Sequence, residues 1–213
     1  MPDLILNPAE ARVLASLVEK SITTPQYYPL TVNAVMLAAN QKTVRNPVMN
    51  LSEGDTGSAL LSLEREKLAA RDDRSGRVPK WRHQMHHQML LKPAEMAVLV
   101  TLMLRGPLTG SELRSAAQPL GGPDDLNEVF ASLSERAQPL ITELPRAPGQ
   151  KEARIAHLLC GVPPATAIRA PAPAAPGSTE HPRASLEHRI AELERRMNEL
   201  EKQLGVSAPP QYE

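Results

Sequence analysis

Apolar residues follow helical spacing in two segments of the chain that begin in the same way. LNPAEARVL starts at residue 6 and LKPAEMAVL starts at residue 91, and six of their nine positions are identical. In each copy the proline suits the first helical position, and the glutamate two residues later can satisfy free amide groups of the first turn. Apolar residues then recur at intervals of three or four, which predicts helices over 8–20 and 93–104.

The remainder of each copy repeats one order of elements. For the first copy we expect helices over 8–20, 32–39 and 58–68, then a β-hairpin over 69–84 with its tip at 74–77. The tripeptide PLT occurs before the second helix of both copies. For the second copy we expect helices over 93–104, after Thr109 and over 124–136, then strands over 140–144 and 153–159.

Three helices followed by a β-hairpin is the order of a winged helix-turn-helix. We therefore expect a mainly α protein with small β-hairpins (α+β), with one winged-helix domain over 1–88 and a second over 89–162. The alternative is a single α+β domain with mixed strands, which the double occurrence of the pattern argues against. A repeat of this length is too long for a solenoid unit.

The chain changes character after the second copy. Residues 163–183 are rich in Ala and Pro, which predicts an extended linker. Residues 184–206 follow a heptad pattern, and the a and d positions are Leu186, Ile190, Leu193, Met197, Leu200 and Leu204. Glutamates at e and arginines at g favour a parallel homodimeric coiled coil. The alternative is an amphipathic helix that folds back on its own domains.

Composition excludes several classes of protein. Lysine and arginine balance aspartate and glutamate, so the formal net charge is zero and no global charge indicates a nucleic-acid or membrane partner. A single cysteine fits a reducing compartment, and no apolar run is long enough for a signal peptide or a membrane span. We therefore expect a cytoplasmic protein.

Several longer motifs resemble one bacterial family. They are LNPAEARVLASLVEK, TTPQYYPLTVNAVMLAANQKTVRNPVM, DRSGRVPKWRH, LLKPAEMAVL, LMLRGPLTGSELR and LPRAPGQKEARIAHLL. Over roughly residues 4–162 the chain resembles the YceH-like family, which is uncharacterised. The resemblance implies tandem winged-helix domains and leaves the activity open.

Candidate chemistry is sparse. His83, His86 and His87 form an H-x-x-H-H cluster, but no neighbouring Cys, Asp or second His pair completes a tetrahedral metal set, so we expect no metal and no cofactor. Cys160 follows two leucines and reads as a small buried hydrophobe rather than a nucleophile. No phosphate-cradling glycine loop or nucleophile motif occurs, and we expect no enzyme.

Basic residues in the first copy are the candidates for contact with DNA. They lie in the loop after the second helix and in the hairpin: Lys42, Arg45, Arg71, Arg74, Arg77, Lys80 and Arg82. Asn40, Gln41 and Asn46 either bind base edges or cap turns. The third helix of the second copy is acidic and would be repelled by phosphate. The alternative for these arginines is a solvated hairpin without a ligand.

Two functions remain open. The first is a non-enzymatic, dimeric regulator that binds DNA through the first domain. The alternative is a protein–protein adaptor that keeps the winged-helix fold without binding nucleic acid, which the zero net charge and the acidic third helix of the second copy favour. Tyr27, Tyr28 and Trp81 either fill a groove between the domains or form a surface for a protein partner.

Overall fold

The computed structural model of the chain describes residues 4–72, 78–146 and 152–163. All of them belong to one compact unit, which spans residues 1–169. The linker beyond residue 163 and the heptad segment 184–206 lie outside the described residues, so the coiled coil stays a prediction. Arg74 and Arg77 of the hairpin tip also lie outside them.

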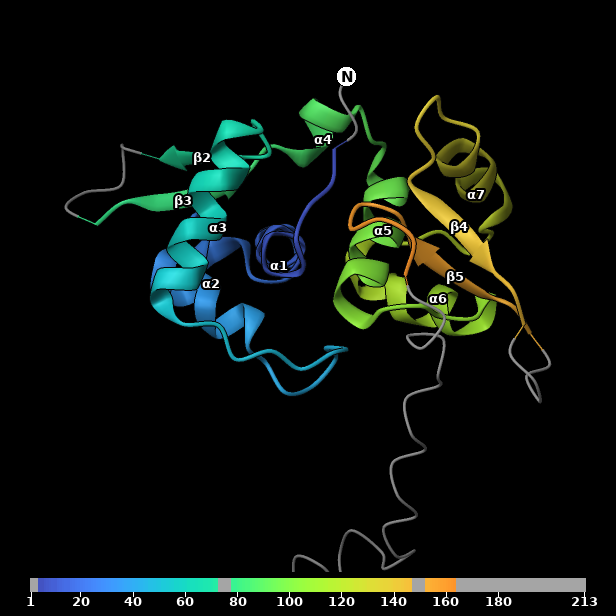
Figure 1. Cartoon of the computed structure of the whole chain (residues 1–213), viewed down its shortest axis with the longest axis horizontal. Helices are drawn as coiled ribbons and strands as arrows, with labels where there is room; N and C mark the ends of the chain where they lie inside the picture. The colour runs from blue at the N-terminus through green and yellow to red at the C-terminus, as the bar shows by residue number, and fades with distance from the viewer. Residues whose placement is uncertain (1–3, 73–77, 147–151, 164–213) are drawn as a thin grey trace, which may run out of the picture. The chain divides into compact units, whose positions relative to one another are not determined.

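The described elements follow the same order in the two copies (Figure 1). The first copy contains α1 (Pro8–Thr23), η1 (Pro25–Tyr27), β1 (Leu30–Thr31), α2 (Val32–Ala39), α3 (Glu53–Arg65), β2 (Ala69–Asp72) and β3 (Lys80–His83). A short helix, α4 (Met85–Met89), then leads to the second copy. That copy contains α5 (Pro93–Arg105), α6 (Gly110–Ala117), η3 (Gln118–Leu120), α7 (Asn127–Ser134), β4 (Ile141–Leu144) and β5 (Arg154–His157).

The two repeated motifs form helix starts, as their sequence predicts. Asn7 caps α1 by accepting a hydrogen bond from the Glu10 amide, and the Glu10 carboxylate accepts one from the Asn7 amide at 2.8 Å. In the second copy Glu95 accepts a hydrogen bond from the Lys92 amide at the same distance. Each carboxylate therefore satisfies an amide that the helix itself leaves free.

The third helices begin at other residues than the sequence pattern predicts. Helix α3 begins at Glu53 rather than Ser58, because Ser52 and Asp55 form a capping box upstream of the predicted start. This box overcomes the low helix propensity of the two glycines that follow Glu53. Helix α7 begins at Asn127 rather than residue 124, and the Asn127 amide donates to the Asp125 carboxylate in the turn before it.

In each copy a short extended segment before the second helix pairs with the hairpin. In the first copy β1 pairs with β3, and the sheet has the antiparallel order β1-β3-β2. In the second copy Leu108 takes the corresponding place, since it exchanges both backbone hydrogen bonds with Ile155 of β5. The repeated PLT tripeptide therefore lies at equivalent positions, and each copy reads helix, strand segment, helix, helix, hairpin.

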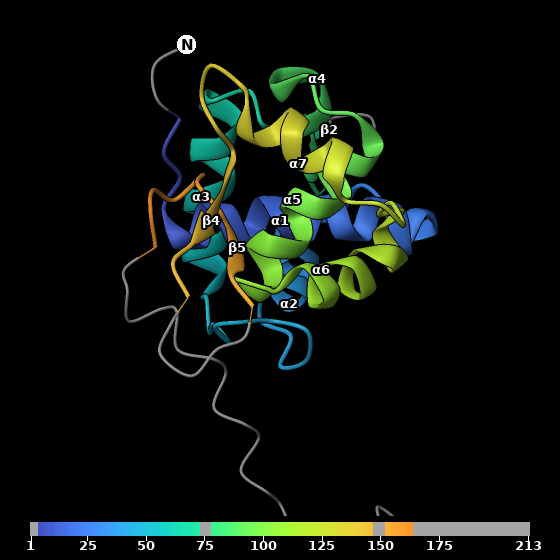
Figure 2. The same cartoon turned by 90° about the vertical axis from the view of Figure 1, so that its right-hand side faces the viewer.

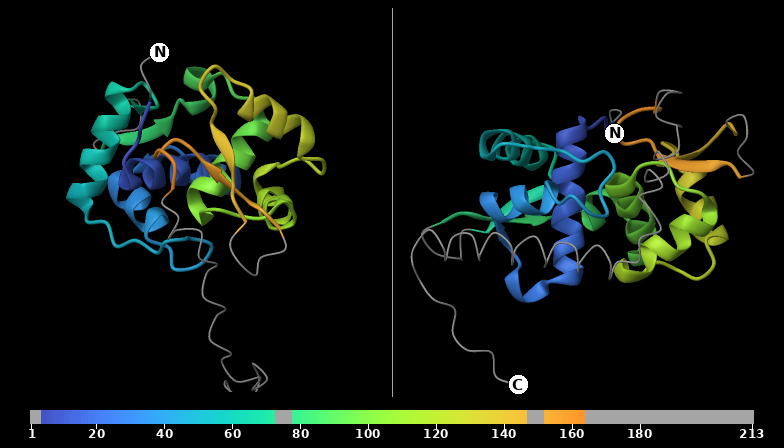
Figure 3. Two further views of the ribbon diagram at one scale, coloured as in Figure 1. Left: turned by 45° about the vertical axis from the view of Figure 1, so that its right-hand side comes forward. Right: turned by 90° about the horizontal axis from the view of Figure 1, so that it is seen from below.

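The first helices of the two copies pack against each other, as Figures 1 and 3 show. Helix α1 also packs on α2 and α3, whereas α5 packs on α6, α7 and β5 (Figure 2). Every residue of α1 from Ala11 to Glu19 is consequently buried. One hydrophobic core runs through both copies, and the boundary predicted after residue 88 falls within α4.

None of the helices that the structure describes is long and apolar enough to cross a membrane.

Candidate nucleic-acid interface

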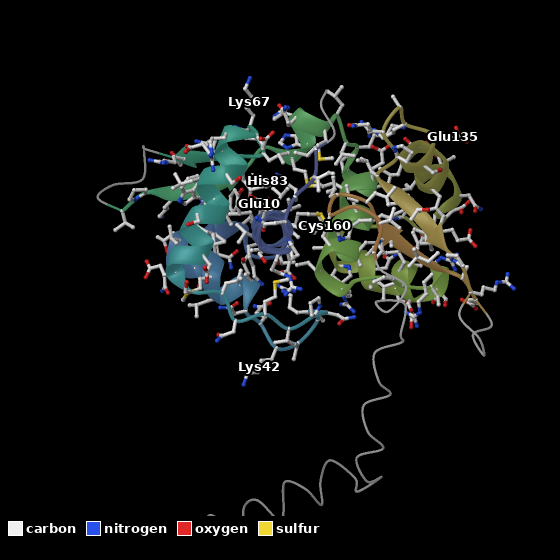
Figure 4. The ribbon with its side chains drawn as sticks, in the orientation of Figure 1. Glu10, Lys42, Lys67, His83, Glu135 and Cys160 are labelled. Carbon is white, nitrogen blue, oxygen red and sulfur yellow. The ribbon has the colours of Figure 1, made fainter. Side chains whose placement is uncertain are left out.

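The predicted DNA-contacting residues that the structure describes do not form one patch. The loop after α2 carries Lys42 and Arg45, β2 carries Arg71, and β3 carries Lys80 and Arg82. Figure 4 shows Lys42 at the lower end of the first copy, whereas β2 and β3 lie at its upper end. A ligand that contacts the hairpin therefore need not reach Lys42.

Arg45 must be removed from the candidate set, because its side chain is fully buried. Its guanidinium forms a bidentate ion pair with Glu19 of α1, with N–O distances of 2.6 and 3.1 Å. It also donates to the Ala38 carbonyl and to the Gln41 side chain. A guanidinium with these partners has no donor to offer a phosphate.

A second buried arginine fixes the same loop. Arg12 of α1 is 1% exposed and donates to the carbonyls of Ala39 and Pro47. Burial, followed by repulsion from Arg45, lowers the pKa of Arg12 to about 10, so the side chain remains charged near neutral pH. Helix α1 therefore holds both ends of the polar segment that follows α2.

The amide side chains of this loop are also engaged within the protein. Asn40 exchanges two hydrogen bonds with the backbone of Leu51, each 2.8 Å long, and closes the loop on itself. The backbone amide of Asn46 donates to the Leu104 carbonyl at the end of α5. Asn40 and Gln41 thus stabilise the loop. Of the two roles considered for them, this is the capping of turns rather than contact with base edges.

Gly106 lets the loop approach the second copy. Its backbone has φ 73° and ψ −162°, a combination that is accessible essentially to glycine alone. A Cβ atom at this position would also lie 3.4 to 3.5 Å from Asn46. The end of α5 is therefore shaped to receive the loop of the first copy.

The arginines of the hairpin strands are exposed but paired. Arg71 forms an ion pair with Glu64 of α3 at 3.2 Å and lies over the ring of Trp81. Arg82 pairs with Asp72 across the sheet at 2.8 Å. Both pairs are partly open to solvent, where such interactions are weak, so a phosphate can compete with the carboxylates for these arginines.

The outer face of α3 is mostly small and uncharged. Ser58, Leu61 and Arg65 are exposed along it, and Leu61 is 44% exposed. The acidic residues at its start cap the helix, and hydrogen bonds from Ser52 lower the pKa of Asp55. Arg65 is the one cation on this face, so charge along α3 gives little attraction for phosphate.

The corresponding helix of the second copy, α7, contains and is followed by acidic side chains. Glu128 and Glu135 are exposed on and after α7, and Figure 4 shows Glu135 at the outer edge of this copy. Glu128 approaches the Lys92 ammonium at 3.5 Å. Within the described residues α7 itself contains no basic side chain, which fits poorly with phosphate contact.

The three histidines gather where β3 meets α4. The His83 and His86 rings lie 5.5 Å apart and the His86 and His87 rings 3.7 Å apart. The Tyr28 hydroxyl accepts a hydrogen bond from the His83 amide, and the His83 ring contacts the Ser21 hydroxyl at 3.2 Å. Burial lowers the pKa of His83 to about 4. Among the described residues no group of three or more His, Cys, Asp or Glu side chains is arranged to hold a metal ion.

The aromatic residues take three different positions. Trp81 is buried in the core of the first copy, opposite Leu30 in the sheet. Tyr28 is half-buried against His83, and burial raises its pKa to about 12. Tyr27 is 71% exposed. Tyr27 therefore remains available to a partner, whereas Trp81 does not.

Cys160 is half-buried beside the shared core. Burial, together with the charge of Glu10, raises the pKa of its thiol to about 11. A thiol with this pKa is protonated at neutral pH and is a weak nucleophile.

Sequence reasoning missed one group of polar side chains. Lys67, Gln84, His87 and Gln88 line a hollow at the base of the hairpin together with Glu64, Ala69 and Ala70. Lys67 has φ 60°, a left-handed conformation that is uncommon for residues other than glycine. The signal in the sequence is a lysine at the end of a helix, where glycine is the usual residue.

The structure thus describes an α+β protein in which one unit of helices and a hairpin occurs twice. Residues 6–150 match the model of the family described as "Protein of unknown function, DUF480". The chain belongs to this family, whose curated members carry the name UPF0502 protein. The YceH-like family that the sequence motifs indicate is this same family, so the prediction is confirmed.

Relatives from several bacteria match most of the chain. The UPF0502 protein of Geotalea daltonii is 46% identical over 176 residues, which cover 81% of each chain. That of Geobacter sulfurreducens is 45% identical over 174 residues, 80% of each chain. That of Azoarcus sp. is 50% identical over 160 residues, 73% of this chain and 71% of the relative.

Proposed function

We propose that the protein is a non-enzymatic, cytoplasmic regulator that binds DNA through its first copy, and that each copy is a winged helix. The observation that carries the proposal is the repeated order of helix, strand segment, helix, helix and hairpin, with the sheet order β1-β3-β2 in the first copy. In winged helices the third helix enters the major groove and the hairpin contacts the backbone.

The charges favour the hairpin over α3 as the main contact. Lys80, Arg71 and Arg82 lie on its strands, and the sequence places Arg74 and Arg77 at its tip. Helix α7 has no basic side chain, which argues against an equivalent role for the second copy. We therefore assign phosphate contact to the first hairpin. Arg65 is the cation that α3 contributes.

The test removes charge from the hairpin without touching its paired arginines. Replacing Arg74, Arg77 and Lys80 with alanine should weaken binding to a fluorescent duplex and flatten its dependence on salt, because each lost phosphate contact reduces the salt slope by about one. Fluorescence anisotropy at several salt concentrations measures both quantities.

A matched control removes the same charge from the second copy. Arg114, Arg146 and Lys92 are exposed there, and their replacement with alanine should leave the salt slope of the wild type. If the two triple variants bind alike, the hairpin is not the interface.

An adaptor function is the second candidate, and exposed apolar residues favour it. Leu37 of α2 is 60% exposed and Leu61 of α3 is 44% exposed, on the two helices that would face DNA. The buried Arg45 further reduces the charge available there. A protein that binds no duplex even at low salt, and whose retention of a partner is lost in Leu37→Ser and Leu61→Ser, would be an adaptor.

A further inference from the structure

The hollow at the base of the hairpin lies between the end of α3, strand β2 and helix α4. Its volume is about 360 Å³, which is within the range of small-molecule sites. The side chains around it are Glu64, Lys67, Ala69, Ala70, Gln84, His87 and Gln88. Two small apolar residues and five polar ones therefore surround a space that suits a small polar ligand.

Backbone hydrogen bonds fix the walls of this hollow. The Leu68 amide donates to the Leu63 carbonyl and ends α3, and the Gln84 amide donates to the Leu68 carbonyl at 2.7 Å. Lys67 directly precedes Leu68, so this hydrogen bond brings Lys67 close to Gln84. The amides of His87 and Gln88 donate in turn to the Gln84 carbonyl, which places α4 against the same turn.

Several donors in the hollow are unused. Within the described part of the chain, the side-chain amides of Gln84 and Gln88 make no hydrogen bond, and no carboxylate lies within 4.0 Å of the Lys67 ammonium. The Glu64 carboxylate is the acidic group of the lining, and its partner is Arg71 at 3.2 Å. The lining thus presents one unpaired cation and several neutral donors.

Lys67 adopts its position at a conformational cost. Its φ of 60° places it in the left-handed region at the end of α3, where glycine avoids the clash of a Cβ atom. The positive side chain interacts favourably with the last carbonyl groups of α3, which offsets part of this cost. This interaction does not require a hollow beside the helix. Strained residues of this kind occur preferentially at ligand sites.

We infer that this hollow binds the phosphate group of a small phosphate ester, with the Lys67 ammonium as its counter-ion and Gln84 and Gln88 as hydrogen-bond donors. A phosphate monoester offers three strong acceptor oxygens, which matches one cation with several neutral donors. The hollow is open to solvent, so a free small molecule can reach it. The inference does not depend on whether the protein binds DNA.

The test follows the backbone amides of the full-length chain by NMR during titration with glycerol 3-phosphate. Inorganic phosphate probes the anion alone, and glycerol is the uncharged control. Glycerol 3-phosphate should shift the amides of Lys67, Ala69, Gln84 and Gln88, and glycerol should not. Lys67→Gly should weaken binding about tenfold, because a charged hydrogen bond is lost.

Lys67→Gly separates a binding role from a structural one. Glycine suits the left-handed backbone, so the variant should unfold at the same or a higher temperature while losing affinity. Lys42→Gly, which removes an exposed lysine elsewhere in the first copy, should bind like the wild type.

Three results would overturn the inference. The first is that glycerol 3-phosphate leaves these amides unshifted, and the second is that it binds Lys67→Gly as tightly as the wild type. The third is that duplex DNA shifts them where glycerol 3-phosphate does not, which would make the hollow a subsite for backbone phosphate.

Discussion

Arg45 is a basic residue in a polar loop, and the sequence pattern therefore placed it among the DNA-contacting residues. Its partner Glu19 is 26 positions away along the chain, so no local pattern indicates the pairing. Burial of α1 on several sides brings the two together in the core. Residue type alone cannot distinguish a guanidinium that meets solvent from one that neutralises a buried carboxylate.

Removing the carboxylate of this pair should destabilise the fold strongly. Glu19→Gln leaves the buried Arg45 without its counter-ion, which costs about 3 kcal/mol of unfolding free energy. Glu64→Gln is the matched control, because the Glu64–Arg71 pair is exposed and its loss costs less than about 1 kcal/mol. Urea denaturation measures both. Equal effects would mean that the Glu19–Arg45 pair behaves like a surface pair.

Two half-buried histidines, His83 and His157, should make stability depend on pH. Burial lowers the pKa of His83 and that of His157 to about 4 each, whereas an unfolded histidine titrates near 6.5. Between these values the unfolded chain binds more protons than the folded one. The free energy of unfolding is therefore complete above about pH 6.5 and falls as the pH drops toward 4.

The expected loss between pH 7 and pH 5 is on the order of 2 kcal/mol for each histidine. His157→Leu should abolish the part of this loss that His157 causes, because leucine does not titrate. The His157 Nδ1 atom has no hydrogen-bond partner within the described residues, so the substitution breaks no hydrogen bond there. Urea denaturation at the two pH values gives the difference. An unchanged pH dependence in His157→Leu would show that His157 is protonated equally in both states.

At the scale of elements, the sequence predicts those features that form through interactions between neighbouring residues, such as helix starts and turns. The starts of α1 and α5 follow from their proline and glutamate positions and that of α6 from Thr109 and Glu112, and their capping bonds are present. The hairpins follow from the turn residues between their strands. Helix α3 was placed too late because its glycines obscured the Ser52–Asp55 capping box.

Elements that depend on distant contacts were not predictable in this way. Strand β1 has two residues, and its pairing with β3 joins segments some fifty positions apart along the chain. Helix α4 spans five residues, too few for a periodic signal. The loop after α2 is polar and rich in turn residues, yet its conformation is set by contacts with Arg12 and Glu19 of α1 and with Leu104 of α5.

The same limit applies to the candidate site. The sequence identified the basic residues of the hairpin strands, and the structure leaves Arg71 and Arg82 exposed there. It could not identify the hollow, because Lys67 and Gln84 are brought together by a distant backbone hydrogen bond, from the Gln84 amide to the carbonyl of Leu68 beside Lys67. Neither residue belongs to a recognisable motif.

At the scale of the molecule, the repeat predicts two similar copies but not their contact. Helices α1 and α5 pack on each other, and the Leu6 amide donates to the Leu159 carbonyl at 2.7 Å, which joins the beginning of the first copy to the end of the second. The apolar spacing in the sequence predicts one buried face of α1, whereas the helix is buried on several sides. Both copies contribute to one core.

Self-association is expected to reside in the heptad segment. Deleting residues 184–213 should convert a dimer to a monomer, because the a and d residues lie within this segment. Light scattering reports the mass. Replacing Leu193 and Leu200 with Glu should have the same effect, whereas Arg195→Ala, outside the seam, should not. An unchanged mass after the deletion would exclude the coiled coil as the dimer contact.

Binding of the full-length protein to a mixed-sequence fluorescent duplex, titrated from about 50 to 200 mM salt, tests the proposed function most directly. A protein that contacts several phosphates through its first hairpin should lose affinity steeply over this range. Absence of binding at the lowest salt, or binding that does not change with salt, would contradict DNA recognition by the hairpin and favour the adaptor function.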